Sequence, residues 1–295
     1  MTEKEAFETE QRVFDIYSGI LINNQEFAGS GETAEITYDF DCPEYKTLIE
    51  KYGIDKIAGE GTAFQRGVRL MHWMAPKLTH KSNYDSHIPV NALDLLDYSL
   101  GRPERGINCL NKSKILAECC LAVGIYARRV SILPYSPYDG DNHVVTEIFD
   151  EDMGKWVMLD PTTDGFFVDE EGGILSVLEL REKFARQDFA TFAVCTEDLS
   201  DLRKLRDRHM EDNAYYCKNL FRLLVDGYNG FGGGKLDLKF IPVGYDLKRN
   251  MIANAEYRIR KFPGCEESAR KWIAKIEAEP DPVPAEPALL AAPPK

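Results

Sequence analysis

The chain contains no apolar stretch that approaches the ~20 residues needed to cross a membrane, so no membrane span is predicted. Its first residues, Met1-Thr-Glu-Lys-Glu-Ala-Phe, lack the basic start and the apolar run of a secretory signal. Basic residues are also in deficit, because 36 Lys and Arg stand against 49 Asp and Glu and leave a net charge of −13. Nucleic acid is bound by clustered cations, so we expect no nucleic-acid partner.

Paired cysteines are missing as well. The chain has seven cysteines, an odd number, and none of them has Cys-x-x-Cys spacing. This pattern indicates neither a disulfide framework nor a zinc site, and a reducing cytoplasm is the simplest location. The glycine-rich run at residues 230–234 is not followed by Lys-Ser or Lys-Thr, which excludes a phosphate loop. We therefore expect no metal and no cofactor.

What the chain does have is the composition of an ordinary globular protein. Of its 295 residues, 44% are hydrophobic and 29% are charged, and this length is enough to bury a sizeable core. Hydrophobic periodicity and breaker residues predict helices at residues 3–17, 62–78, 89–100, 109–123, 201–228 and 266–278. Alternating apolar residues predict strands at residues 35–40, 127–133, 143–149, 155–160 and 236–243.

The helix predicted at residues 109–123 carries the candidate nucleophile, Cys109. Asn108, or Cys109 itself, would lie at the N-cap, and Gly124 is a suitable C-terminal stop. A cysteine attacks only as a thiolate, and the positive end of a helix dipole favours an anion at this position. A nearby imidazole that takes the thiol proton would favour the thiolate further.

His143 is the candidate for that imidazole, and Asp160 is the candidate for the group that orients it. His143 begins one predicted strand and Asp160 ends the next, with a turn at about residue 152. In an antiparallel hairpin this spacing places the two residues almost opposite each other, within the slip of one or two bulges. Opposed side chains share a face, with Cβ atoms about 5 Å apart. We therefore expect Asp160 to accept the Nδ1 proton of His143 and to leave Nε2 facing the thiol.

Three blocks of sequence resemble the core of the transglutaminase-like superfamily. The first is Gly106-Ile-Asn-Cys109, which opens a helix that ends Ala-Val-Gly124-Ile-Tyr-Ala-Arg128-Arg-Val. The others are His143-Val-Val-Thr-Glu-Ile-Phe and Lys155-Trp-Val-Met-Leu-Asp160-Pro-Thr162. In that family these blocks hold the catalytic Cys, His and Asp in this order. The resemblance covers about residues 62 to 170, and its specificity lies in the set of three blocks in order.

The resemblance implies an α+β fold with a papain-like core, in which the helix that bears the nucleophile packs on an antiparallel sheet that carries His and Asp. It also implies a cysteine-dependent hydrolase or acyltransferase that works through a thioester on Cys109. We expect hydrolysis to dominate, with a peptide, a protein or a small amide as substrate. The alternative is a non-catalytic binding module that keeps the fold. The oligomeric state is left open.

Four regions follow from this interpretation. Residues 1–61 would form an N-terminal extension and residues 62–190 the catalytic core. Residues 191–278 would form a mostly helical extension packed on the core. Residues 279–295 are Pro, Ala and Glu with few large side chains, and they are predicted to be a disordered tail.

The remaining cysteines and histidines have plain structural interpretations. Cys119 and Cys120 lie among apolar residues of their helix and are expected in the core. No partner pattern surrounds the other cysteines, which are interpreted as structural or exposed: Cys42, Cys195, Cys217 and Cys265. His72 is interpreted as a packing or surface residue of an apolar helix. The polar loop at residues 81–86, flanked by His80 and His87, is a candidate for an edge of the active site.

Overall fold

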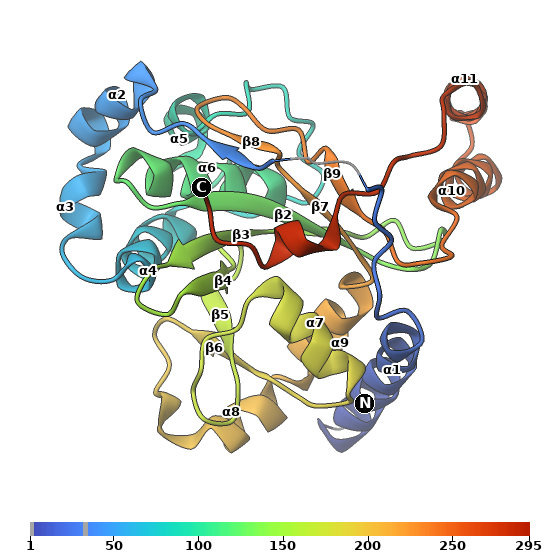
Figure 1. Ribbon diagram of the computed structural model, residues 1–295, viewed down its shortest axis with the longest axis horizontal. Coiled ribbons are helices and arrows are strands. Elements are labelled where there is room, and N and C mark those ends of the chain that lie inside the picture. Colours follow the sequence, from blue (N-terminus) through green and yellow to red (C-terminus); the bar gives the residue numbers. More distant parts are fainter. Residues whose placement is uncertain (1–2, 32–34) are drawn as a thin grey trace.

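An antiparallel sheet of five strands lies at the centre of the computed structural model, which describes residues 3–31 and 35–295 (Figure 1). The spatial order of its strands is β4 (Lys155–Leu159), β3 (His143–Asp150), β2 (Ala127–Leu133), β7 (Arg222–Val225) and β9 (Leu238–Phe240). The strands β2, β3 and β4 follow each other in the sequence and form a meander. β3 is buried along its whole length because helices cover both faces of the sheet.

The helices divide into two layers, one on each face (Figure 1). On one face the core includes residues of α2 (Pro43–Tyr52), α3 (Ile54–Ala58), α4 (Ala63–Met74), α5 (Ala92–Ser99) and α6 (Cys109–Ala122). On the other face the core includes residues of α1 (Glu3–Ile22), α7 (Val177–Ala185) and α9 (Met210–Asn219). The strand pair β5 (Gly165–Val168) and β6 (Thr191–Val194) continues from the end of β4.

The alternation of side chains along β4 explains how one strand serves both layers. Val157 and Leu159 belong to the core beneath α4 and α6, whereas Met158 between them belongs to the opposite core. Successive residues of a strand point to opposite faces, so a fully apolar strand is suited to the middle of three layers. The predicted α+β fold, with the Cys109 helix packed on an antiparallel sheet, is confirmed.

We expected the region after residue 191 to be a helical extension packed on a finished core, and the structure contradicts this expectation. Its strands β7 and β9 are members of the central sheet, and β7 pairs with β2 from Val130↔Val225 to Leu133↔Arg222. The helix predicted over residues 201–228 is therefore wrong beyond Asn219, where α9 ends. A short apolar run such as Arg222–Val225 has no period that separates helix from strand, and pairing with β2 decides its conformation.

The expected disorder of residues 279–295 is also contradicted. Ala285 and Leu290 are buried, and the segment forms the short 3-10 helix η3 (Pro287–Leu290). The guanidinium of Arg128 donates to the carbonyls of Leu289 (3.2 Å) and Leu290 (2.5 Å), and the indole N–H of Trp156 donates to the carbonyl of Ala292 (2.8 Å). Backbone carbonyls hold this segment, and a low content of large side chains gives no sign of such bonds.

The other elements lie at the periphery. They are β1 (Thr37–Tyr38), β8 (Tyr228–Asn229), α8 (Leu202–Arg208), α10 (Leu247–Lys261), α11 (Glu266–Ala278), and the 3-10 turns η1 (Ala75–Lys77) and η2 (Leu199–Asp201). α10 and α11 pack on each other at one end of the molecule (Figure 1). Within the described ranges, no helix has the length and apolar character of a membrane span.

Candidate active site

Cys109 is the first residue of α6. The side-chain oxygen of Asn108 accepts a hydrogen bond from the backbone N–H of Asn111 (3.2 Å), which caps the helix and fixes where it begins. Cys109 is partly exposed, whereas every residue from Asn111 to Leu121 is buried. The thiol therefore stands at the accessible end of an otherwise buried helix, next to the positive end of the helix dipole.

His143 begins β3, Asp160 directly follows β4, and their side chains meet. The Nε2 atom of His143 lies 2.8 Å from Oδ2 of Asp160. Only 5% of His143 is exposed and Asp160 is fully buried. The structure thus brings together the two strand-end residues that the hairpin argument paired.

Two details of that hairpin argument are wrong. In the observed register Thr146 faces Leu159, which places Asp160 opposite Val145. His143 lies two residues before Val145 on β3. The contact is therefore diagonal, and diagonal neighbours in a sheet are farther apart than opposed ones. The outer ring nitrogen, Nε2, makes the contact, and not Nδ1 as expected. Nδ1 is left for a partner on the other side of the ring.

Asp160 is held by four hydrogen-bond donors. Its Oδ2 accepts from His143, from the hydroxyl of Tyr216 and from the hydroxyl of Thr163 (2.8 Å). Its Oδ1 accepts from the backbone N–H of Thr162 (2.8 Å). A buried carboxylate with this many donors is held in one orientation and is stabilised in its charged form.

The charges of the pair support each other. Burial lowers the pKa of His143, but the carboxylate of Asp160 and the neighbouring Cys109 outweigh burial and raise that pKa to about 10. Burial likewise raises the pKa of Asp160, but His143 and the hydroxyl of Tyr216 hold it well below its usual range. At neutral pH the pair is therefore an imidazolium and a carboxylate. A positive charge next to a thiol favours the thiolate.

Aromatic and cationic side chains complete the surroundings of His143. The rings of Tyr215 and Tyr216 lie edge-on to the imidazole, with centroids 5.8 and 5.7 Å away. Lys112, one turn after Cys109, is buried, and its ammonium lies 3.4 Å from the carbonyl of Pro161 in the turn after Asp160. The backbone of His80 pairs with Ile107, so the polar loop that begins there lies beside the segment that leads to Cys109.

The sequence patterns missed three residues that support His143 and Asp160. Lys112 follows Cys109 by three positions, which places it on the same side of the helix, and this spacing was a usable signal. Thr163 stands in the Asp-Pro-Thr-Thr turn, where hydroxyls commonly bond to a nearby carboxylate. Tyr216 lies 56 residues after Asp160 and is brought to it only by the packing of α9, so no local pattern marks it.

Replacement of Tyr216 by phenylalanine is expected to lower kcat about tenfold with little change in KM, since ~1.4 kcal/mol of orientation is lost. The variant removes one donor from the buried Asp160 and keeps the ring that packs against His143. Steady-state kinetics on a working substrate measures this effect. The matched control is Tyr52→Phe, which also removes a hydroxyl bonded to a carboxylate, that of Asp97 (2.6 Å), at a remote position. Equal losses in both variants would assign Tyr216 no role beyond packing.

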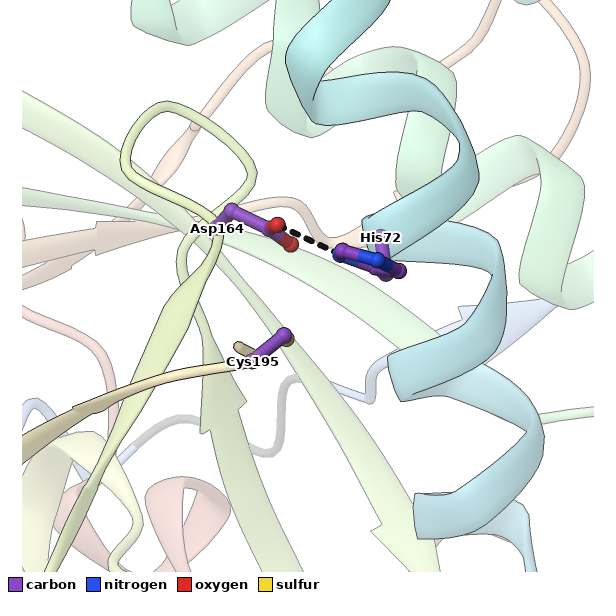
Figure 2. A group of neighbouring side chains, drawn as sticks. All are labelled: His72, Asp164 and Cys195. Atoms are coloured by element: carbon purple, nitrogen blue, oxygen red, sulfur yellow. Dashed lines mark hydrogen bonds and ion pairs between the residues drawn. The ribbon is translucent and has the colours of Figure 1, made fainter. Parts of the chain in front are cut away.

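Three side chains of the types that bind metal ions lie close together at the far end of the turn that follows Asp160. His72 of α4, Asp164 and Cys195 place one ligand atom each within 4.8 Å of one another, and Figure 2 shows the three side chains converging. Asp164 lies four residues after Asp160, so this group and the His143–Asp160 pair share one short segment.

The part of the chain that holds this site is similar to a known protein family. Residues 51–161 match the model of the transglutaminase-like superfamily, and Cys109, His143 and Asp160 all lie inside the matched range. A search of curated proteins found no match. A solved structure from Cytophaga hutchinsonii, described as a "putative cysteine protease", is similar with a TM-score of 0.33 and 16% identity over 56% of this chain. The similarity spans 59% of the length of that protein. The match of residues 51–161 to this family model supports a cysteine-dependent catalytic role in general.

Proposed function

We propose that this protein is a cysteine-dependent hydrolase of amide or peptide bonds, with Cys109 as nucleophile, His143 as base and Asp160 as the group that orients the base. The observation that carries the proposal is the buried contact between His143 Nε2 and Asp160 Oδ2 beside the start of α6. This contact fixes the ring and leaves Nδ1 for the thiol of Cys109. Nucleophile, base and orienting acid then stand in the order that a catalytic triad requires.

The chemistry follows from this arrangement. In the resting pair Nδ1 of His143 already holds the proton of the thiol, and the thiolate of Cys109 attacks the carbonyl carbon of the substrate. The imidazolium then gives its proton to the departing nitrogen, so that an amine leaves and a thioester remains. Neutral His143 next takes a proton from water, which attacks the thioester, so that a carboxylic acid leaves and the pair of Cys109 thiolate and His143 imidazolium is restored. Asp160 stays ionised throughout and balances the positive ring.

The start of α6 also offers a place for the negative charge that develops on the substrate oxygen. The first N–H groups of a helix have no partner within the helix, and that of Cys109 lies next to the attacking sulfur. A donor in this position stabilises the tetrahedral intermediate, and such donors are worth about 10²–10³ in rate. We assign the backbone N–H of Cys109 this role.

The segment before His143 favours water over an amine as the acceptor. Residues 134–142 expose Tyr135 and Tyr138, and the ammonium of Lys218 lies 3.0 Å from both Asp139 and Asp141. This one positive charge offsets half of the negative charge of the two carboxylates and weakens their attraction for a cationic amine. An acyl transfer to a bulky amine also requires a dry tunnel, and this segment is polar.

The same segment lines a cleft of about 580 Å³ whose opposite wall is formed by α10 and α11. Tyr138 and Trp272 are exposed on its two sides. The cleft ends at Asn142, the residue before His143, and Cys109, His143 and Asp160 are not among its lining residues. A cleft of this volume suits an extended substrate that continues toward His143, and we propose a peptide or protein chain in preference to a small amide.

Competition between water and an amine tests the hydrolase part of the proposal. With a working acyl donor and a labelled primary amine at increasing concentration, we expect free acid to remain the main product at millimolar amine. Mass spectrometry of the products measures the ratio of acid to amide. Amide formation that exceeds acid at modest amine concentration would make the protein an acyltransferase.

Selective alkylation tests the nucleophile independently of any substrate. Brief treatment with iodoacetamide near pH 6, followed by peptide mapping, is expected to label Cys109 before any other cysteine, because its thiol is partly exposed at the start of α6 and has His143 beside it as proton acceptor. Burial raises the pKa of Cys120 to about 12 and also that of Cys217, so these thiols are both neutral and inaccessible.

The control for this experiment is His143→Ala, in which the advantage of Cys109 should disappear while the exposed end of α6 remains. Cys265, whose thiol donates to the carbonyls of Arg258 and Phe262, serves as the internal reference. Faster labelling of Cys265 than of Cys109 in the natural protein would contradict an activated nucleophile and would favour a binding module without catalysis.

A further inference from the structure

Three side chains from separate parts of the chain converge outside the Cys109 site. His72 lies in the last turn of α4, Asp164 lies in the turn that joins β4 to β5, and Cys195 follows β6 (Figure 2). The Nδ1 atom of His72 is 2.7 Å from Oδ2 of Asp164. The backbone N–H of Cys195 donates to the carbonyl of Asp164 (3.0 Å), so the two residues are fixed relative to each other.

The donor set has a distinct chemical preference. An imidazole nitrogen, a carboxylate oxygen and a thiolate sulfur together suit a borderline-soft divalent ion such as Zn²⁺, and they do not suit Ca²⁺ or Mg²⁺, which prefer oxygen alone. The three ligand atoms all lie within 4.8 Å of one another. Around a tetrahedral Zn²⁺ with ordinary bond lengths such atoms are roughly 3.3–3.6 Å apart. A small movement of these side chains would therefore bring the three ligand atoms to the spacing of a coordination shell.

Asp164 shows that the group has unused binding capacity. Its Oδ1 atom is buried and has no hydrogen-bond partner among the described residues. A buried carboxylate oxygen without a donor is unusual and calls for an ion or a water. His72 leaves half of its side chain exposed to solvent, whereas only 17% of the Asp164 side chain is exposed. Asp164 therefore holds the group on its buried side, and the exposed His72 leaves the other side accessible to solvent.

We propose that His72, Asp164 and Cys195 form a binding site for one divalent transition-metal ion of the Zn²⁺ class. The fourth position, on the exposed side next to His72, is taken by water. On binding, the thiol of Cys195 gives its proton to solvent and coordinates as thiolate, and the hydrogen bond between His72 and Asp164 is replaced by two bonds to the metal. The ring of His72 supplies most of the movement, because it lies at the surface.

The position of the site suggests a structural role. Asp164 ends the turn that holds Asp160 through the N–H of Thr162 and the hydroxyl of Thr163. An ion on Asp164 would tie this turn to α4 on one side and to the end of β6 on the other. The metal would then stabilise the fold and the placement of Asp160. The proposed reaction does not require the open coordination position of the metal.

Titration of the metal-free protein with Co²⁺ tests the site directly. Co²⁺ reports both the thiolate ligand, through a charge-transfer band in the near ultraviolet, and the geometry, through its visible bands. We expect one equivalent to bind with a thiolate band and a tetrahedral pattern, and Zn²⁺ to displace it. Zn²⁺ should also raise the Tm of the natural protein by a few degrees. Binding without a thiolate band, or no binding at all, would overturn the proposal.

Matched variants assign the ligands. Cys195→Ser should abolish the charge-transfer band, and His72→Ala should weaken Co²⁺ binding at least about tenfold. His87→Ala is the control, because His87 is equally exposed and its Nδ1 lies 2.5 Å from Asp85, yet within residues 3–31 and 35–295 no cysteine accompanies this pair. Cys109→Ala should leave the band unchanged. A band that is retained in Cys195→Ser or lost in Cys109→Ala would place the metal elsewhere.

A second variant keeps the proposal testable if one of the variants does not fold. If Cys195→Ser does not fold, His72→Ala still decides the question, because a change at this exposed side chain has little effect on the metal-free fold. A Tm that rises with Zn²⁺ equally in His72→Ala and in the natural protein would overturn the assignment. Binding is measured without substrate, so the outcome is independent of the proposed hydrolase activity.

Discussion

Replacement of Cys109 by alanine is expected to lower kcat/KM by at least about 10⁴-fold and to leave the fold intact. Removal of a nucleophile from a catalytic triad leaves only the contributions of substrate binding and of the oxyanion donor, which accounts for a loss of this size. The fold should tolerate the change because Cys109 is partly exposed at the start of α6, and the cap of the helix is supplied by Asn108. We expect the free energy of unfolding to change by less than about 1 kcal/mol.

Two measurements on the same preparation check this result. Hydrolysis of a validated substrate gives kcat/KM, and urea unfolding followed by circular dichroism gives the stability. Cys265→Ala is the control, since Cys265 also lies at the beginning of a helix and is partly exposed, but its thiol donates to backbone carbonyls at the end of α10. More than a small residual rate in Cys109→Ala, at unchanged stability, would show that another group attacks the substrate.

The sequence was sufficient for the parts of the site that are encoded locally. The start of α6 follows from the Asn108 cap and its end from Gly124, whose backbone φ of 79° favours glycine. The hairpin β3–β4 follows from alternation and a turn, so His143 and Asp160 were placed near each other. Their register was wrong by two residues, because turn position alone does not count the residues in each strand.

The parts that failed depend on contacts between distant segments. Strand β7 joins the sheet because β2 offers it a free edge, and β9 pairs in turn with β7; no property of Arg222–Val225 alone indicates this. Cysteine spacing gave no sign that His72, Asp164 and Cys195 meet, because each lies on a different element. One missed helix did carry a signal: the capping box formed by Ser176 and Glu179 precedes the buried face of α7.

Replacement of Asp160 by asparagine is expected to lower kcat by about 10²–10⁴-fold, because the neutral amide neither holds the imidazolium by charge nor offers two acceptors. All four groups that contact Asp160 are donors: His143, Tyr216, Thr163 and the N–H of Thr162. An asparagine must turn its NH₂ toward at least one of them, in either orientation. We therefore also expect the free energy of unfolding to fall by about 1–3 kcal/mol.

The pH dependence separates the electrostatic role of Asp160 from simple misfolding. In the natural protein the pKa of His143 is raised from 6.5 to about 10, so the stability that this pair contributes is complete below about pH 6.5 and is lost as the pH rises toward 10. The pKa of Asp160 is lowered from 3.8, so the same stability is present above about pH 4 and is lost as the pH falls further. The excess stability of the natural protein over Asp160→Asn should therefore be largest between about pH 4 and 6.5.

Urea unfolding of both proteins across pH 3 to 10 measures this difference, and the pH profile of kcat/KM gives a second reading. Without the carboxylate, burial lowers the pKa of His143, and the alkaline limb of the profile should move down by more than about one pH unit. A difference in stability that is constant over the whole range, with an unmoved alkaline limb, would mean that Asp160 serves only to hold the turn after β4 and that some other group stabilises the imidazolium.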